Sequence, residues 1–114
     1  MKKIILTLTA ILAITTPALS HSKAEDTSPA SGATVKIVGA IELRFDHPMR
    51  VTAIKLTGPD GELEVIRENG LDPVTEFRAK PPENMPAGAY TVDWRGLSSD
   101  GHPMRGTFEF TVAD

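Results

Sequence analysis

The chain has 114 residues, with 12 basic and 15 acidic side chains, nine glycines, nine prolines and no cysteine. This length accommodates one domain, and the lack of cysteine excludes a disulfide framework and a cysteine-linked lipid anchor. No apolar stretch after Ser20 approaches the roughly 18 residues that a membrane-spanning helix needs. We therefore expect one small domain without membrane insertion.

Residues 1–20 have the pattern of a cleavable export signal. Lys2 and Lys3 precede an almost uncharged apolar run, and Ala18-Leu19-Ser20 places small residues at the first and third positions, as a signal peptidase requires. Cleavage after Ser20 would leave a domain of residues 21–114 that begins with His21. The sequence therefore predicts a soluble exported protein.

The net charge of the domain also limits its partners. Without Lys2 and Lys3 the chain keeps ten basic and fifteen acidic residues, a net charge of −5. Nucleic acids and anionic membranes bind through basic patches, so this balance argues against both.

Apolar and polar residues alternate with a period of two along most of residues 21–114, which is typical of half-buried strands. Gly58-Pro59-Asp60-Gly61 and Glu68-Asn69-Gly70 are hairpin signals, and the prolines of 81–86 predict a long connection. No window shows a helical period over three turns. Seven short strands predict an all-β, Ig-like sandwich. These strands are Ser22–Ser28, Ile41–Phe45, Ile54–Thr57, Leu63–Arg67, Val74–Arg78, Tyr90–Arg95 and Thr107–Val112.

Two aromatic residues support this fold class. Gly88 and Tyr90 at the start of the sixth predicted strand resemble a tyrosine corner. We expect Tyr90 and Trp94 to be core residues, because aromatic side chains in an alternating strand pack inward.

Sequence signatures of familiar enzymes are missing. The chain has no cysteine nucleophile, no Gly-x-Ser-x-Gly elbow and no glycine-rich phosphate loop before a helix. Ser98 and Ser99 lie close to His102 in sequence, but this spacing is weak support for a catalytic triad. We do not expect an enzyme.

The three histidines are the candidate metal ligands. His21, as the new N-terminus, would offer an α-amine and an imidazole to one ion, the nitrogen donors that Cu(II) prefers in tetragonal geometry. Asp100 can add a carboxylate beside His102, and Gly101 permits a tight turn between them. His47 completes the set, and each histidine is expected at a chain end or in a loop.

The Ig-like topology brings these histidines together. The start of the first strand, the second-to-third loop and the sixth-to-seventh loop lie at one end of such a sandwich. The two loops share a repeated pattern that makes them further candidates for the site. It reads Asp46-His47-Pro48-Met49-Arg50 in one loop and Asp100-Gly101-His102-Pro103-Met104-Arg105 in the other. The sequence therefore predicts one metal site at this end.

The methionines are the other candidate copper ligands. Met49, Met85 and Met104 carry soft sulfur atoms that suit Cu(I). They form no methionine-rich cluster, and methionine more often fills gaps in cores. We expect them to be packing residues, with a Cu(I) role left open.

Over nearly its whole length the domain resembles the CopC family of periplasmic copper-binding proteins. The residues that carry this resemblance are His21 after the export signal, Thr27–Ala33, Ile41–Phe45 with the following turn, Pro86–Arg95 and Ser98–Pro103.

The resemblance implies a seven-stranded cupredoxin-like or Ig-like β-barrel without a blue-copper centre, located in the periplasm. It implies one Cu(II) per chain, held by the amine and imidazole of His21, the imidazole of His102 and the carboxylate of Asp100. It also implies a role in copper sequestration or carriage, and an inner-membrane copper transporter of the CopD type as partner.

The chain departs from the family pattern in two places. Leu56-Thr57 runs directly into Gly58, so the methionine-rich insertion that carries a second, Cu(I) site in some members is missing. His47 occupies a position that often holds an acidic residue. It can be an extra ligand, a pH-sensitive neighbour or, as we favour, a hydrogen-bond partner of a ligand.

Two other functions stay open at this stage. A histidine chelate at the N-terminus with a second histidine resembles the brace of copper-dependent polysaccharide oxygenases, although the domain is small and lacks an aromatic-rich flat surface. A metal-free Ig-like interaction module is the second alternative.

Overall fold

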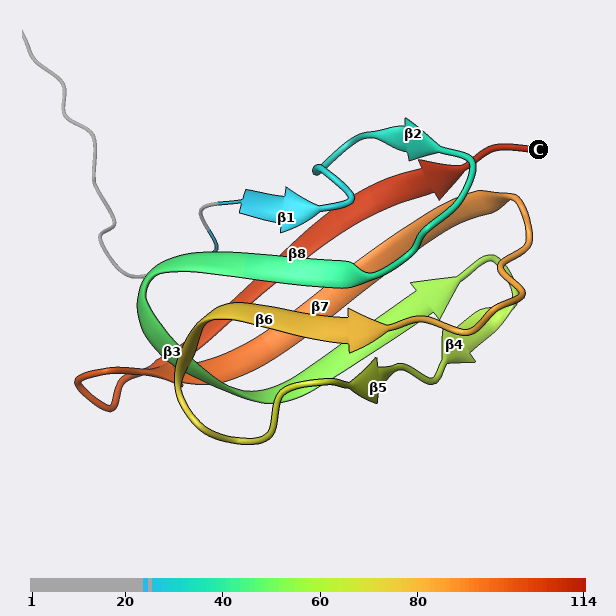
Figure 1. The fold of residues 1–114 in the computed structure, drawn as a ribbon. Helices are drawn as coiled ribbons and strands as arrows, with labels where there is room; N and C mark the ends of the chain where they lie inside the picture. Colours follow the sequence, from blue (N-terminus) through green and yellow to red (C-terminus); the bar gives the residue numbers. More distant parts are fainter. Residues whose placement is uncertain (1–23, 25) are drawn as a thin grey trace, which may run out of the picture.

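The computed structural model describes residue 24 and residues 26–114, and every regular element in this part of the chain is a β-strand. Eight strands form one hydrogen-bonded sheet that curls so that its two halves face each other across the core (Figure 1). The strands are β1 Asp26–Ser28, β2 Thr34–Val35, β3 Ile41–Gly58, β4 Gly61–Leu63, β5 Ile66–Arg67, β6 Val74–Lys80, β7 Gly88–Ser98 and β8 Pro103–Val112.

Strand β3 belongs to both halves of the sheet. In its first part Leu43 lies opposite Thr27 of β1 and Phe77 of β6. In its second part Leu56 lies opposite Val92 of β7 and Leu63 of β4. The first half is therefore β1, β3, β6 and β5, and the second is β4, β3, β7, β8 and β2.

A large bulge separates the two parts of β3. Arg44 lies opposite Glu76 and Met49 opposite Val74, so residues 45–48 of β3 face Thr75 alone. A second register shift follows between Val51 and Ala53. Bulges bend a strand and increase its twist, which explains how one strand passes from the first half of the sheet to the second.

The inward residues of both halves form one apolar core. Phe45 meets Trp94 edge to face across the core, with ring centroids 5.2 Å apart, and Tyr90 stacks on Phe110 at 5.5 Å. The buried residues are Ile41, Leu43, Phe45, Met49, Val51, Leu56, Phe77, Ala79, Tyr90, Val92, Trp94, Phe108, Phe110 and Val112.

The predicted tyrosine corner is present. The buried Tyr90 hydroxyl donates a hydrogen bond to the carbonyl oxygen of Pro86, four residues upstream. Burial raises the pKa of Tyr90, and the carboxylate of Asp60 adds to the effect. The hydroxyl therefore stays protonated as a donor at neutral pH.

The all-β sandwich class is confirmed, and its strands differ from the predicted ones in detail. The predicted strands at 41–45 and 54–57 are parts of one strand, because bulges rather than a loop join them. The predicted strand Leu63–Arg67 divides into β4 and β5, which pair in different halves of the sheet. Strand β2, parallel to β8, was not predicted, since two residues carry no period. Residues 22, 23 and 25 of the first predicted strand lie outside the described residues.

Gly106 allows a close contact with the core. A Cβ atom at Gly106 would lie 2.7 Å from Nε1 of Trp94, its partner in the strand register. The change Gly106→Ala should therefore lower the free energy of unfolding by about 1–3 kcal/mol in urea denaturation, as expected for overpacking. Gly39→Ala is the matched control because open space surrounds its Cβ position, and it should leave the stability unchanged or raise it by up to about 1 kcal/mol. Equal stability of the two variants would contradict this packing.

Candidate metal centre

The hairpin that joins β7 and β8 carries two of the predicted ligands. Strand β7 ends at Ser98 and β8 begins at Pro103, with Leu97 opposite Pro103. The Gly101 amide donates to the Ser98 carbonyl at 2.8 Å, and the Ser98 amide donates to the His102 carbonyl at 2.9 Å. Gly101 has a φ of +87°, the left-handed conformation that glycine adopts readily. The expected tight turn is therefore present.

The side chains of this loop converge on Asp100. The Ser98 hydroxyl donates to Oδ1 of Asp100, and Nδ1 of His102 lies 3.0 Å from the same oxygen. Oγ of Ser98 also accepts the His102 amide at 3.2 Å. Because these contacts use Oδ1 and Nδ1, the second carboxylate oxygen and Nε2 of the ring are the atoms available to a metal ion.

These contacts keep the carboxylate ionised. The hydrogen bond from Ser98, followed by that from His102, lowers the pKa of Asp100 from 3.8 to about 2. The charged loop thus stabilises the fold above about pH 4 and loses this contribution as the pH falls toward 2. The side chains of Asp100 and His102 are 70% and 73% exposed, so solvent screens their attraction and the stabilisation is small.

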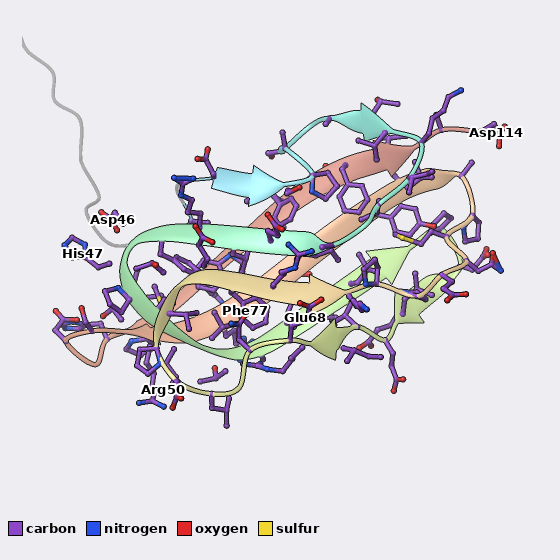
Figure 2. The ribbon with its side chains drawn as sticks, in the orientation of Figure 1. Asp46, His47, Arg50, Glu68, Phe77 and Asp114 are labelled. Carbon is purple, nitrogen blue, oxygen red and sulfur yellow. The ribbon has the colours of Figure 1, made fainter. Side chains whose placement is uncertain are left out.

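His47 occupies a different local structure from the one predicted. It lies within β3, in the bulge of residues 45–48, and not in a loop between strands. Its Nδ1 lies 3.3 Å from Oδ1 of Asp46, and its side chain is 69% exposed. Figure 2 shows both side chains beyond the bend of β3. The bulge explains the difference, because it keeps strand geometry while releasing these residues from pairing.

The strand register places the bulge and the hairpin at the same end of the sheet. Met49 of β3 lies opposite Ser98 of β7, two residues from His47 and from Asp100 respectively. The two His–Asp pairs stay separate, however. Within residues 24 and 26–114, no three His, Asp or Glu residues lie close enough to hold one metal ion. His21 lies outside the described residues.

Ser98 has a structural role in this loop that the sequence analysis does not predict. Its spacing to His102 gives only weak support for a nucleophile, whereas in the structure its hydroxyl donates to Asp100 and accepts the His102 amide, which positions the carboxylate. A serine two residues before an aspartate in a tight turn is a signal for such side-chain hydrogen bonds.

The described residues contain no helix with the length and apolar character needed to cross a membrane.

The chain is thus a small β-sandwich whose exposed β7–β8 hairpin carries an aspartate–histidine pair, and this makes it a candidate metal-binding domain. The family model of the CopC domain matches residues 24–113, and the chain belongs to the CopC family.

Individual relatives cover most of the chain. Copper resistance protein C of Escherichia coli is 31% identical, over 98% of this chain and 97% of that protein. Copper resistance protein C of Pseudomonas syringae pv. tomato is 30% identical, over 83% and 82%. The crystal structure of CopC from Methylosinus trichosporium OB3b superposes with a TM-score of 0.70 at 31% identity, covering 82% of this chain and 94% of that one. PcoC, a methionine-rich copper resistance protein from Escherichia coli, superposes with a TM-score of 0.67 at 32% identity, covering 82% of this chain and 99% of that one.

The contact between Ser98 and Asp100 has a measurable consequence. The change Ser98→Ala removes the main donor to the carboxylate, so the pKa of Asp100 should rise from about 2 toward 3.8. Carboxyl chemical shifts followed by NMR during a pH titration would measure this rise. Ser99→Ala is the control in the same loop and should leave the pKa unchanged. An unchanged pKa in Ser98→Ala would show that Ser98 does not hold Asp100.

Proposed function

We propose that this protein is an exported copper-resistance protein that binds one Cu(II) per chain and sequesters or carries it. The observation that carries this proposal is the aspartate–histidine pair on the β7–β8 hairpin. Ser98 orients this pair through its hydrogen bond to Asp100. Membership of the CopC family and the names of its relatives, copper resistance proteins C, support copper as the ligand.

The proposed ligands are the amine and imidazole of His21, the imidazole of His102 and the carboxylate of Asp100. Three nitrogens and one oxygen suit the tetragonal geometry of Cu(II). Of this set, Asp100 and His102 are among the described residues. Their side chains are exposed to solvent, with Oδ1 of Asp100 3.0 Å from Nδ1 of His102. His47, already beside Asp46 at the same end of the sheet, is proposed as a hydrogen-bond partner of a ligand.

The methionines support Cu(II) rather than Cu(I) as the bound ion. Met49 is buried in the core, and Met85 and Met104 pack against it. Gly58 lies opposite Gly61, so a tight hairpin stands where some family members insert methionines. This packing supports the expectation that the three methionines fill the core, with Cu(II) as the proposed ion.

Export and partnership complete the proposal. Cleavage after Ser20 would place residues 21–114 in the periplasm and create the α-amine of His21. A transporter of the CopD type in the inner membrane is the proposed partner. In this function the protein holds an ion without turning over a substrate, so we do not propose an enzyme.

The ligand set predicts how changes in the chain affect Cu(II) binding. One extra residue before His21 should abolish tight binding, because the α-amine is then removed from the chelate. His102→Ala should weaken binding at least about tenfold through loss of one ligand. Met104→Ala is the control on the same hairpin and should bind normally. Calorimetric titration with electron paramagnetic resonance would test this, and normal binding by the extended chain would exclude His21.

The affinity for Cu(II) should fall steadily from pH 8 to pH 5. Imidazoles and α-amines ordinarily titrate at about 6.5 and 7.7–8.0, and protons compete with the metal for them. Asp100, with a pKa of about 2, stays ionised throughout and does not contribute to the slope. Asp100→Asn should therefore bind more weakly at every pH but keep the same slope. A flat pH profile of the unmodified protein would contradict the nitrogen ligands.

A further inference from the structure

The outer face of the second half of the sheet carries three neighbouring cations. Arg95 of β7 lies opposite Arg105 of β8, and on the next row Lys55 of β3 lies opposite Asp93. All three cations are exposed and line one surface hollow of about 700 Å³. We name Lys55, Arg95 and Arg105 the basic face.

The cations of the two halves of the sheet differ in their partners. On the first half, Arg44 pairs with Asp26, and Arg78 pairs with Glu42 and Glu68. The basic face forms no ion pair with any residue that the structure describes. Like charges directly opposite each other destabilise a sheet, so the pair of arginines is not explained by stability.

The single carboxylate in the hollow does not neutralise these cations. Asp93 accepts a hydrogen bond from the hydroxyl of Thr107 at 2.7 Å, and Thr107 lies opposite it in the register. Three positive charges against one negative charge leave the hollow positive, within a chain whose net charge is −3. A positive hollow in an acidic protein attracts anionic groups locally.

The inward-facing row of Ile54, Trp94 and Gly106 lies between the outward-facing rows of the basic face. Trp94 is only 3% exposed and its indole packs against Phe45 in the core, so it contributes backbone and no aromatic surface to the hollow. The side chains that reach the hollow are mainly the cations, and arginine pairs with carboxylates through two parallel hydrogen bonds, which suits an acidic segment.

The basic face adjoins the β7–β8 hairpin. One register row separates Arg95 and Arg105 from Leu97 and Pro103, where the loop with Asp100 and His102 begins. Arg50 of β3 lies opposite Leu97 in the register, and its guanidinium donates to the Leu71 carbonyl between β5 and β6. A segment bound in the hollow would therefore lie beside the hairpin.

We propose that the basic face docks an acidic segment of a partner protein next to the hairpin. A short segment can enter the hollow and meet the cations alone. A broad anionic surface such as a membrane or a nucleic acid would also meet the acidic remainder of the molecule, which repels it. The proposal concerns the metal-free protein and does not depend on copper binding.

The test uses metal-free protein and a ten-residue peptide of alternating glutamate and alanine, at low ionic strength. Calorimetry reports binding, and the fluorescence anisotropy of a labelled copy of the peptide is the second readout. The double variant Arg95→Gln/Arg105→Gln should raise the Kd at least about tenfold. Lys36→Gln/Lys80→Gln changes the charge equally at two exposed lysines outside the basic face and is the matched control. It should raise the Kd less than about twofold.

Three results would overturn the proposal. Equal weakening in both double variants would show that net charge alone attracts the peptide. Binding to phosphatidylglycerol vesicles without binding to the peptide would assign the basic face to a membrane. No peptide binding by the unmodified protein would remove the docking function, while the copper titrations above would still report on the metal site separately.

Discussion

The passage of strand β3 from one half of the sheet to the other is the constraint on which the rest of the structure depends. Its first part pairs with β1 and β6, its second part with β7 and β4, and its inward residues contribute to a single core. Phe45, at the bulge, meets Trp94 of the opposite half edge to face. The same bulge exposes Asp46 and His47 at the end where the β7–β8 hairpin lies. Core closure and the placement of polar residues therefore have one origin.

The candidate metal centre combines a fixed backbone with exposed side chains. Cross-hairpin hydrogen bonds and the left-handed Gly101 determine the loop, and Ser98 orients Asp100 beside His102. Burial plays little part, since the side chains of Asp100 and His102, the proposed ligands, are mostly exposed. Ligands that are held in place before binding need less ordering when a metal arrives. Their exposure also leaves the ion accessible for transfer, which suits the proposed sequestration or carriage of copper.

Charges are distributed unequally over the two halves of the sheet. The first half neutralises Arg44 and Arg78 in ion pairs with carboxylates across strands. The second half leaves Arg95 and Arg105 opposite each other beside a hollow. This asymmetry places a positive surface next to the hairpin of an acidic protein. Under the proposals above, one end of the molecule would hold the ion and the adjoining face would select a partner.

The sequence by itself determined the fold class and two local features, a tight turn and a tyrosine corner. A period of two predicted an all-β sandwich, and Gly101 and Tyr90 predicted a tight turn and a tyrosine corner, because these features depend on neighbours in the chain. Only the tertiary structure decided that β3 is continuous, that His47 lies in a bulge, and that Ser98 positions Asp100. It also brought Arg95 and Arg105 together. These features depend on pairing between strands far apart in sequence, and periodicity within one strand carries no information about its partner's register.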